Sequence, residues 1–292
     1  MAYERALSMK IFPKFLVVFL VPALLVSGCA SVTDRDISNI TPQGEPKTDE
    51  QVVGEQIHQQ ILASFYPYTD PKVVRYVNDI GHKLAAHAQR KKLEYQFTIL
   101  YNEKIYATSA PGGYIYITTG MMNFLQSEAE LAAVLAHEIG EVQCPDPRFS
   151  NHEIINSAIQ AGASIAPMFG PFGSLASLGL VLFQAYNEGS KKTPEERLLA
   201  SDAAALRYLV ESGYDPQALI NVQENFLRAE KALTPYFYDY YQSRPITEKR
   251  MKALAKGFEK LSLAEKELTT APAEYQEMTR GIREIYKTTP HS

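Results

Sequence analysis

The chain has 292 residues, of which 46% are hydrophobic and 21% are charged, and its formal net charge is −4. An apolar fraction this high with so little net charge excludes an intrinsically disordered chain. The acidic balance, with a sequence pI near 5.9, argues against a nucleic-acid partner. The two cysteines cannot build a disulfide framework or a four-thiolate metal site.

The first 28 residues resemble a bacterial lipoprotein signal peptide. Two lysines precede an apolar run at 15–26, which is too short to span a bilayer comfortably, and Val-Ser-Gly leads directly into Cys29. The resemblance implies cleavage before Cys29 and acylation of this residue as a lipid anchor. Ala30 favours sorting to the outer membrane, facing the periplasm. The alternatives are an uncleaved membrane anchor and an ordinary secretion signal.

Behind the signal we expect a tether at 29–50, a domain at 51–262 and a C-terminal helical tail at 263–292. Apolar periodicity and alternation predict helices at about 50–62, 70–87, 127–142, 194–210, 216–231, 247–261 and 273–286, and strands at 95–101 and 114–118, with a turn at 111–113. The predicted fold is therefore α+β and mostly helical, with a small sheet.

Two apolar or aromatic segments have more than one interpretation. Residues 154–186 contain no charged side chain, but prolines and glycines interrupt the run. This segment is too broken for a membrane span, which leaves a buried helical hairpin or a surface facing the membrane or an unfolded client. The aromatic cluster at 236–241 packs in the core or lines a peptide-binding cleft.

The predicted helix at 127–142 carries the most informative residues. A helical zinc-peptidase site needs two ligands one turn apart and a glutamate directly after the first ligand, which deprotonates the metal-bound water. His137 and Glu138 fit this pattern, and Glu141 stands at the second ligand position. A carboxylate is a permissible zinc ligand, so this difference alone does not abolish a site.

A wider series of motifs resembles the gluzincin metallopeptidases of family 48, which include HtpX, BepA and CAAX-prenyl-protease relatives. The matching segments occur in the family's order and cover about residues 50–262; they are 110–120, 132–140, 201–209, 213–218 and 243–250. The resemblance implies a gluzincin-like domain with a small sheet beside the site helix, and a zinc endopeptidase with two helical histidines and a downstream glutamate as ligands.

Several of the family's functional positions are changed in this chain. Carried over one by one, the positions are His137 as first ligand, Glu138 as general base, Glu141 in place of the second histidine, Leu198 in place of the third ligand, Asp202 as the carboxylate that orients a ligand histidine, and Arg244 in place of a late histidine. Leucine cannot coordinate metal, so the site departs from the three protein ligands of a catalytic zinc.

Other residues offer ways to complete or replace the metal site. A shift in helix register would bring Glu195 or Glu196 into the place of Leu198. Cys144 and His152 lie beyond the end of the predicted site helix, and the sequence leaves open whether they reach the metal site. Alternatively, the guanidinium of Arg244 pairs with Glu138 or Glu141 and replaces the charge of the metal, or it is a solvated surface cation. Two further histidines, His82 and His87, are interpreted as structural.

Three functional hypotheses follow. The first is an outer-membrane lipoprotein for envelope protein quality control that keeps the peptidase fold and binds clients without cleaving them. The second is an active zinc-dependent metalloendopeptidase that uses His137, Glu141 and a further ligand, with Glu138 as general base. The third is a structural lipoprotein that assists outer-membrane assembly through the apolar segment. Each has envelope or outer-membrane proteins as partners and contacts the membrane through its lipid anchor, and the family resemblance implies zinc.

Overall fold

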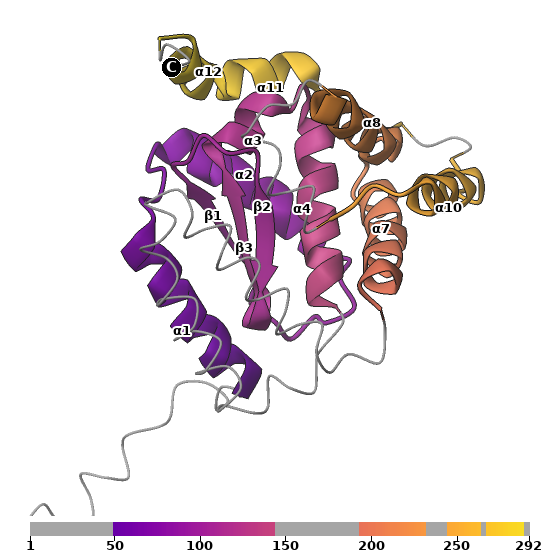
Figure 1. Ribbon diagram of the computed structural model, residues 1–292, viewed down its shortest axis with the longest axis horizontal. Helices are drawn as coiled ribbons and strands as arrows, with labels where there is room; N and C mark the ends of the chain where they lie inside the picture. Colours follow the sequence, from indigo (N-terminus) through magenta and orange to yellow (C-terminus); the bar gives the residue numbers. More distant parts are fainter. Residues whose placement is uncertain (1–48, 144–192, 232–243, 264–266, 289–292) are drawn as a thin grey trace, which may run out of the picture. The chain divides into compact units, whose positions relative to one another are not determined.

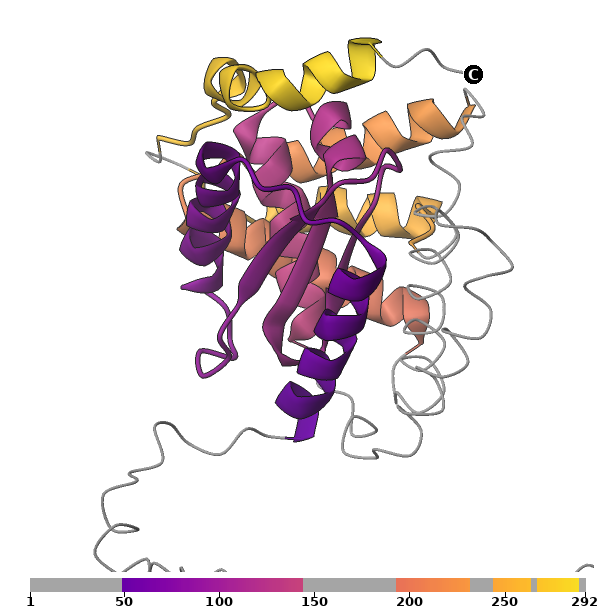
Figure 2. The same ribbon diagram turned by 90° about the vertical axis from the view of Figure 1, so that its left-hand side faces the viewer.

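The computed structural model describes residues 49–143, 193–231, 244–263 and 267–288, and all of these belong to one compact unit, Pro46–Ser292. A small sheet lies between helical layers (Figures 1 and 2), which confirms the predicted α+β, mostly helical class. The predictions for the signal, Cys29, the tether, Cys144, His152, the apolar segment and the aromatic cluster fall outside the described residues. No described helix is both long enough and apolar enough to cross a bilayer.

The sheet has three strands in the order β1-β3-β2. The central strand β3 (Tyr114–Thr118) runs parallel to β1 (Gln96–Leu100) and antiparallel to β2 (Ala107–Ala110). The alternating Tyr and Ile of β3 are all buried, because helices cover both faces of the sheet. The sequence did not predict β2, whose short Ala-Thr-Ser-Ala run carries little strand signal. The turn η1 (Pro111–Gly113) joins β2 to β3, and the positive φ of its two glycines suits that residue type.

Helix α1 (Asp49–Ser64) covers one face of the sheet (Figure 2). It packs closely against η1: a Cβ built on Gly54 would lie only 1.9 Å from the carbonyl oxygen of Pro111. His58 stacks on the ring of Tyr114, with ring centroids 4.7 Å apart, and its Nδ1 lies 2.9 Å from the hydroxyl of Tyr116. These contacts join the start of the domain to the central strand.

Helices α2 (Pro71–Ala85) and α4 (Glu128–Val142) pack against the rest of the sheet. Asn78 of α2 donates a hydrogen bond to the carbonyl of Phe97, and Nε2 of His82 lies 3.1 Å from the carbonyl oxygen of Tyr95, so α2 covers the outer edge of β1. The helix ends at Ala85 instead of the predicted His87, whose ring lies 3.6 Å from Glu211. Both histidines therefore make structural contacts.

The remaining described helices extend the fold on the α4 side of the sheet (Figure 1). They are α3 (Thr119–Phe124), α7 (Pro194–Glu211), α8 (Gln217–Lys231), α10 (Glu248–Glu259), α11 (Pro272–Met278) and α12 (Arg280–Thr288). Helices α7, α8 and α11 pack against α4, α10 packs on α7 and α8, and α12 packs on α3 and α11. The short helix α3 was not predicted, and the single helix predicted at 273–286 is two helices. At the contact between α4 and α7, a Cβ on Gly140 would lie 2.8 Å from the carbonyl oxygen of Ser201, so only glycine allows this approach of the two helices.

Candidate functional site

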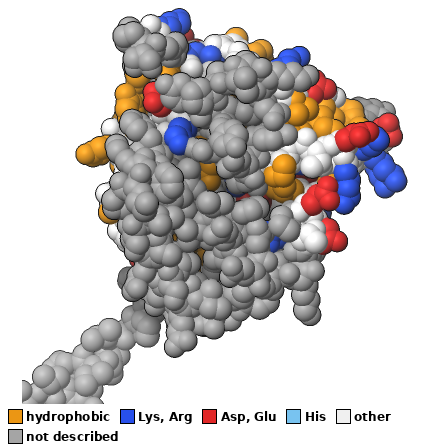
Figure 3. Space-filling model, in the orientation of Figure 1, with side chains coloured by type: hydrophobic (Ala, Val, Ile, Leu, Met, Phe, Trp, Pro, Cys, Tyr) orange, Lys and Arg blue, Asp and Glu red, His pale blue; other side chains and the backbone are white. Residues whose placement is uncertain are grey.

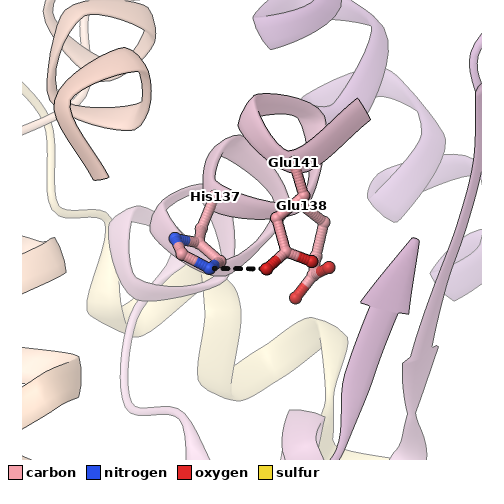
Figure 4. A group of neighbouring side chains, drawn as sticks. All are labelled: His137, Glu138 and Glu141. Atoms are coloured by element: carbon pink, nitrogen blue, oxygen red, sulfur yellow. Dashed lines mark ion pairs between the residues drawn. The ribbon is translucent and has the colours of Figure 1, made fainter. Parts of the chain in front are cut away.

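Helix α4 brings His137, Glu138 and Glu141 together (Figure 4). The helix begins at its predicted cap, where the side chain of Ser127 accepts a hydrogen bond from the main chain. One potential ligand atom from each of the three residues lies within 4.8 Å of the others, and Nε2 of His137 is 3.6 Å from Oε1 of Glu141. One helical turn separates these two residues, which explains their shared direction.

Two residues behind His137 fix its ring. Oδ1 of Asp202, on α7, lies 2.8 Å from Nδ1 of His137. Arg250, on α10, binds the same carboxylate at two points, with Nε 2.6 Å from Oδ2 and a terminal nitrogen 2.9 Å from Oδ1. The sequence pointed to Asp202 but missed Arg250, because nothing in the residue order distinguishes this buried arginine from the exposed lysines around it.

Arg244 lies between the two glutamates of α4. One terminal guanidinium nitrogen is 2.9 Å from Oε2 of Glu138 and 2.7 Å from Oε2 of Glu141. The side chain of Arg244 is only 5% exposed, so its interpretation as a solvated surface cation is wrong. The main-chain carbonyl of Arg244 accepts a hydrogen bond from Arg250, which joins this segment to the Asp202 pair.

Burial and these ion pairs shift the pKa values of the cluster in different directions. Burial lowers the pKa of His137, but hydrogen bonds to Asp202 and Glu141 outweigh it and raise the value to about 9. Burial raises the pKa of Glu138 to about 7 against the opposing effect of Arg244. Burial also disfavours the charge of Glu141, yet Arg244 and His137 hold its pKa well below the usual range. Around neutral pH, His137 is therefore a cation and Glu141 a carboxylate.

The two glutamates considered as replacement ligands, Glu195 and Glu196, do not join this cluster. Leu198 is buried one turn before Asp202 on α7. Glu195 instead pairs with Lys249 at 2.7 Å, and the carboxylate of Glu196 accepts hydrogen bonds from Thr193 at the start of α7. The idea that a register shift brings one of these two carboxylates to the metal is therefore wrong.

The described residues do not fit a three-ligand catalytic zinc. His137, Arg244 and Arg250 supply three positive charges, and they face three carboxyl groups, those of Glu138, Glu141 and Asp202. These cations already compensate the carboxylates of Glu141 and Asp202 without a metal ion, and a divalent cation next to Arg244 would meet repulsion. A catalytic zinc also needs a third protein ligand and an open position for water. The third ligand position is Leu198, which cannot coordinate metal, and in the described part of the chain no neighbour of Leu198 takes that role.

Tyr106 and the strand that follows it complete the surroundings. Burial raises the pKa of the Tyr106 hydroxyl, while the nearby charge of Arg244 opposes that rise; no sequence signal pointed to this tyrosine. Helix α4 packs against β2, and within the described residues β2 pairs with a strand on one side only. An extended edge therefore runs beside the charged cluster.

Comparisons with known proteins match the sequence of this chain to one family. The model of peptidase family M48, which is zinc-dependent in general, matches residues 71–257. The beta-barrel assembly-enhancing protease of Escherichia coli is 26% identical over 67% of this chain and 39% of its own length. The protein of the same name from Yersinia pestis is 28% identical over 59% of this chain and 36% of its own length. The chain thus spans well under half the length of these relatives.

Proposed function

Because the chain belongs to peptidase family M48, we propose that it is a degenerate metallopeptidase of the cell envelope that binds envelope or outer-membrane proteins without cleaving them. The relatives named beta-barrel assembly-enhancing protease support a role beside outer-membrane proteins. A role in envelope protein quality control would use the family's cleft to hold an unfolded segment.

The observation that carries the proposal is the buried contact of Arg244 with Glu138 and Glu141. A general base must be free to take a proton from water, and in this family that water is activated by zinc. Here a guanidinium holds the base and the residue at the second ligand position. Glu138 is also completely buried, so the cluster is built to be stable rather than to exchange water.

Among the described residues, β2 has a strand partner on one side only, which suggests how a client binds. The amide of Thr118 in β3 donates to the carbonyl of Tyr106, just before β2. Counting from Tyr106, every second residue of β2 therefore bonds to β3, and the residues between them direct their main-chain groups to the opposite side. By this register, the main-chain groups of Ala107 and Ser109 point away from β3; Ala107 is buried and Ser109 is partly exposed. An extended client segment would add as a further strand there, through main-chain hydrogen bonds that tolerate many sequences.

The proposed location is the periplasmic side of the outer membrane. Residues 1–28 have the pattern of a lipoprotein signal, and the acyl chains on Cys29 would anchor the chain. A client released near the membrane would then meet the domain at the end of its tether.

A second candidate function is an active zinc metalloendopeptidase. The 3.6 Å between Nε2 of His137 and Oε1 of Glu141 is compatible with both atoms binding one ion at about 2 Å each. This candidate requires that Arg244 leave the two carboxylates and that a further ligand come from outside the cluster.

Metal content separates the two candidates. The full chain is purified from cells grown with added zinc and compared with the His137→Ala, Glu141→Ala double variant. We expect no zinc in the unaltered chain above the level of the variant. About one zinc per chain, lost in the variant, would overturn the proposal and favour the peptidase.

Client binding is measured with a fluorescently labelled, unfolded outer-membrane protein. Ser109→Pro removes one outward main-chain donor of β2 and should weaken binding, whereas the matched variant Ser109→Ala keeps that donor and should bind normally. Equal binding by both variants would exclude the β2 edge, and cleavage of the client would exclude a binding-only role.

A further inference from the structure

The last turn of α4, which carries Glu141 of the charged cluster, is held at its end by Arg90. A terminal guanidinium nitrogen of Arg90 donates to the main-chain carbonyl of Val142 at 3.0 Å, and its main-chain amide donates to Oε1 of Gln143 at 2.9 Å. Gln143 in turn donates to the carbonyl of Ile139. The last carbonyls of a helix have no partner within the helix, so these bonds determine whether the turn stays wound.

The same guanidinium is fixed by Glu50, in the first turn of α1. Its two terminal nitrogens lie 2.8 Å from Oε1 and 2.6 Å from Oε2 of Glu50, a two-point contact that sets the plane of the guanidinium. Oε1 of Glu50 also accepts a hydrogen bond from the amide of Gly112 in η1. Both side chains are largely shielded from solvent, with 24% and 17% exposed.

Helix α1 is itself rigidly placed. Val53 and Ile57 are fully buried, and the close approach of Gly54 to η1 leaves no room for the helix to slide. Helix α1 therefore holds Glu50, and through it the guanidinium of Arg90, in a fixed place beside the end of α4.

We propose that Arg90 is a positioning residue that couples the start of α1 to the carboxylates of Glu138 and Glu141. When the hydrogen bond from Arg90 to the carbonyl of Val142 is lost, the last turn of α4 loosens and Glu141 moves relative to Arg244. This coupling goes beyond the proposed function, because it holds whether the cluster binds clients or metal.

The test compares the full chain with the variants Glu50→Gln, Arg90→Lys and Arg90→Ala, by hydrogen exchange with mass spectrometry and, on samples labelled with ¹⁵N in the histidines, by NMR. Loss of one charge-assisted hydrogen bond should speed amide exchange at residues 140–143 by about tenfold and shift the ring signals of His137. Arg90→Lys keeps the charge opposite Glu50 but not the fork geometry, so it should give an intermediate effect.

Glu128→Gln is the matched control, because it removes a carboxylate charge at the other end of the same helix. It should leave exchange at 140–143 and the His137 signals unchanged. Faster amide exchange confined to α1, with unchanged ring signals of His137, would overturn the proposal. Arg90 would then stabilise only its immediate surroundings. Glu50→Gln changes no buried cavity, so it keeps the test readable if Arg90→Ala unfolds. Because neither readout is zinc content, failure of the coupling is distinct from failure of the proposed function.

Discussion

The two ends of α4 hold their carboxylates in different ways. At the start, Glu128 accepts hydrogen bonds from the hydroxyls of Tyr76 and Tyr214, each at 2.8 Å. Near the end, Glu138 and Glu141 share a nitrogen of Arg244. The first arrangement uses neutral donors, and the second uses a buried cation.

The helix dipole explains why the two ends need different partners. It favours negative charge at the start of a helix and disfavours it at the end, so Glu128 is stable with two hydroxyl donors. Glu138 and Glu141 lie towards the unfavourable end and are buried as well, and therefore require a positive partner. In this structure the positive partner of both carboxylates is Arg244. Carboxylates placed against the dipole mark the functional end of α4.

Removing the positive charge of Arg244 should have the largest effect on the free energy of unfolding. Arg244→Ala leaves two carboxylates buried without their partner, and we expect the free energy of unfolding to fall by about 3–5 kcal/mol. Urea denaturation at neutral pH measures the loss. Arg244→Lys, which keeps a positive charge, should lose clearly less; an equal loss in both variants would mean that packing, not charge, holds the end of α4.

The next largest effect should appear as a pH dependence. His137 has a folded-state pKa of about 9 against about 6.5 when unfolded, so its stabilising effect is complete below about pH 6.5 and lost as the pH rises through 9. We expect the free energy of unfolding to fall by on the order of 3 kcal/mol over this range. Denaturant titrations at several pH values measure it.

The control for this slope is His137→Gln, which should remove the alkaline fall. His58 provides the opposite sign: burial lowers its pKa, so its protonation should destabilise the fold as the pH drops below about 6.5. A stability curve that stays flat from pH 6.5 to 9 in the unaltered chain would contradict a charged His137.

At the start of α4, a smaller effect is expected. Tyr214→Phe removes one neutral hydrogen bond to Glu128 and should lower the free energy of unfolding by about 1 kcal/mol. Tyr66→Phe is the control, because that side chain is 82% exposed and should change nothing measurable. A loss at Tyr214 as large as that of Arg244→Ala would remove the distinction between the two ends.

The smallest effect concerns the exposed face of α10. Acidic and basic side chains are interspersed where α10 lies, at the right of Figure 3, and Glu195 pairs there with Lys249. Exposed pairs contribute little, so Glu195→Gln should change neither stability nor metal content. A loss of more than about 1 kcal/mol of stability in this variant would contradict the exposed, weak character of this pair.

Local sequence patterns predicted the elements whose signal lies within themselves. The strand β3 alternates Tyr and Ile, and α4 combines a serine cap with a long apolar run, so both were found within a residue or two of their bounds. The strand β2 was missed because its small residues are extended only through pairing with β3. The two-helix end of the chain was missed for a similar reason: Arg283 and Tyr275 reach carbonyls near the end of α3, far away in sequence.

The candidate site divides in the same way. His137, Glu138 and Glu141 were predictable because one helix turn brings them together, and Asp202 because a family motif marks it. Arg250 and Tyr106 were not, since their approach to the site depends on how α10 and β2 pack. From the sequence, Arg244 was either a surface cation or a partner of the two glutamates. Its side chain is only 5% exposed and contacts Glu138, so it is a partner of the glutamates.

The sequence by itself determined the fold class, the family and the three residues that one helix places side by side. Tertiary structure decided what surrounds them: a guanidinium between two carboxylates, an arginine behind Asp202 and an ion pair from α1 at the end of α4. The physical reason is that helix periodicity places side chains only within one element. Charge compensation in a buried site depends on residues that are distant in sequence and meet only when the helices pack.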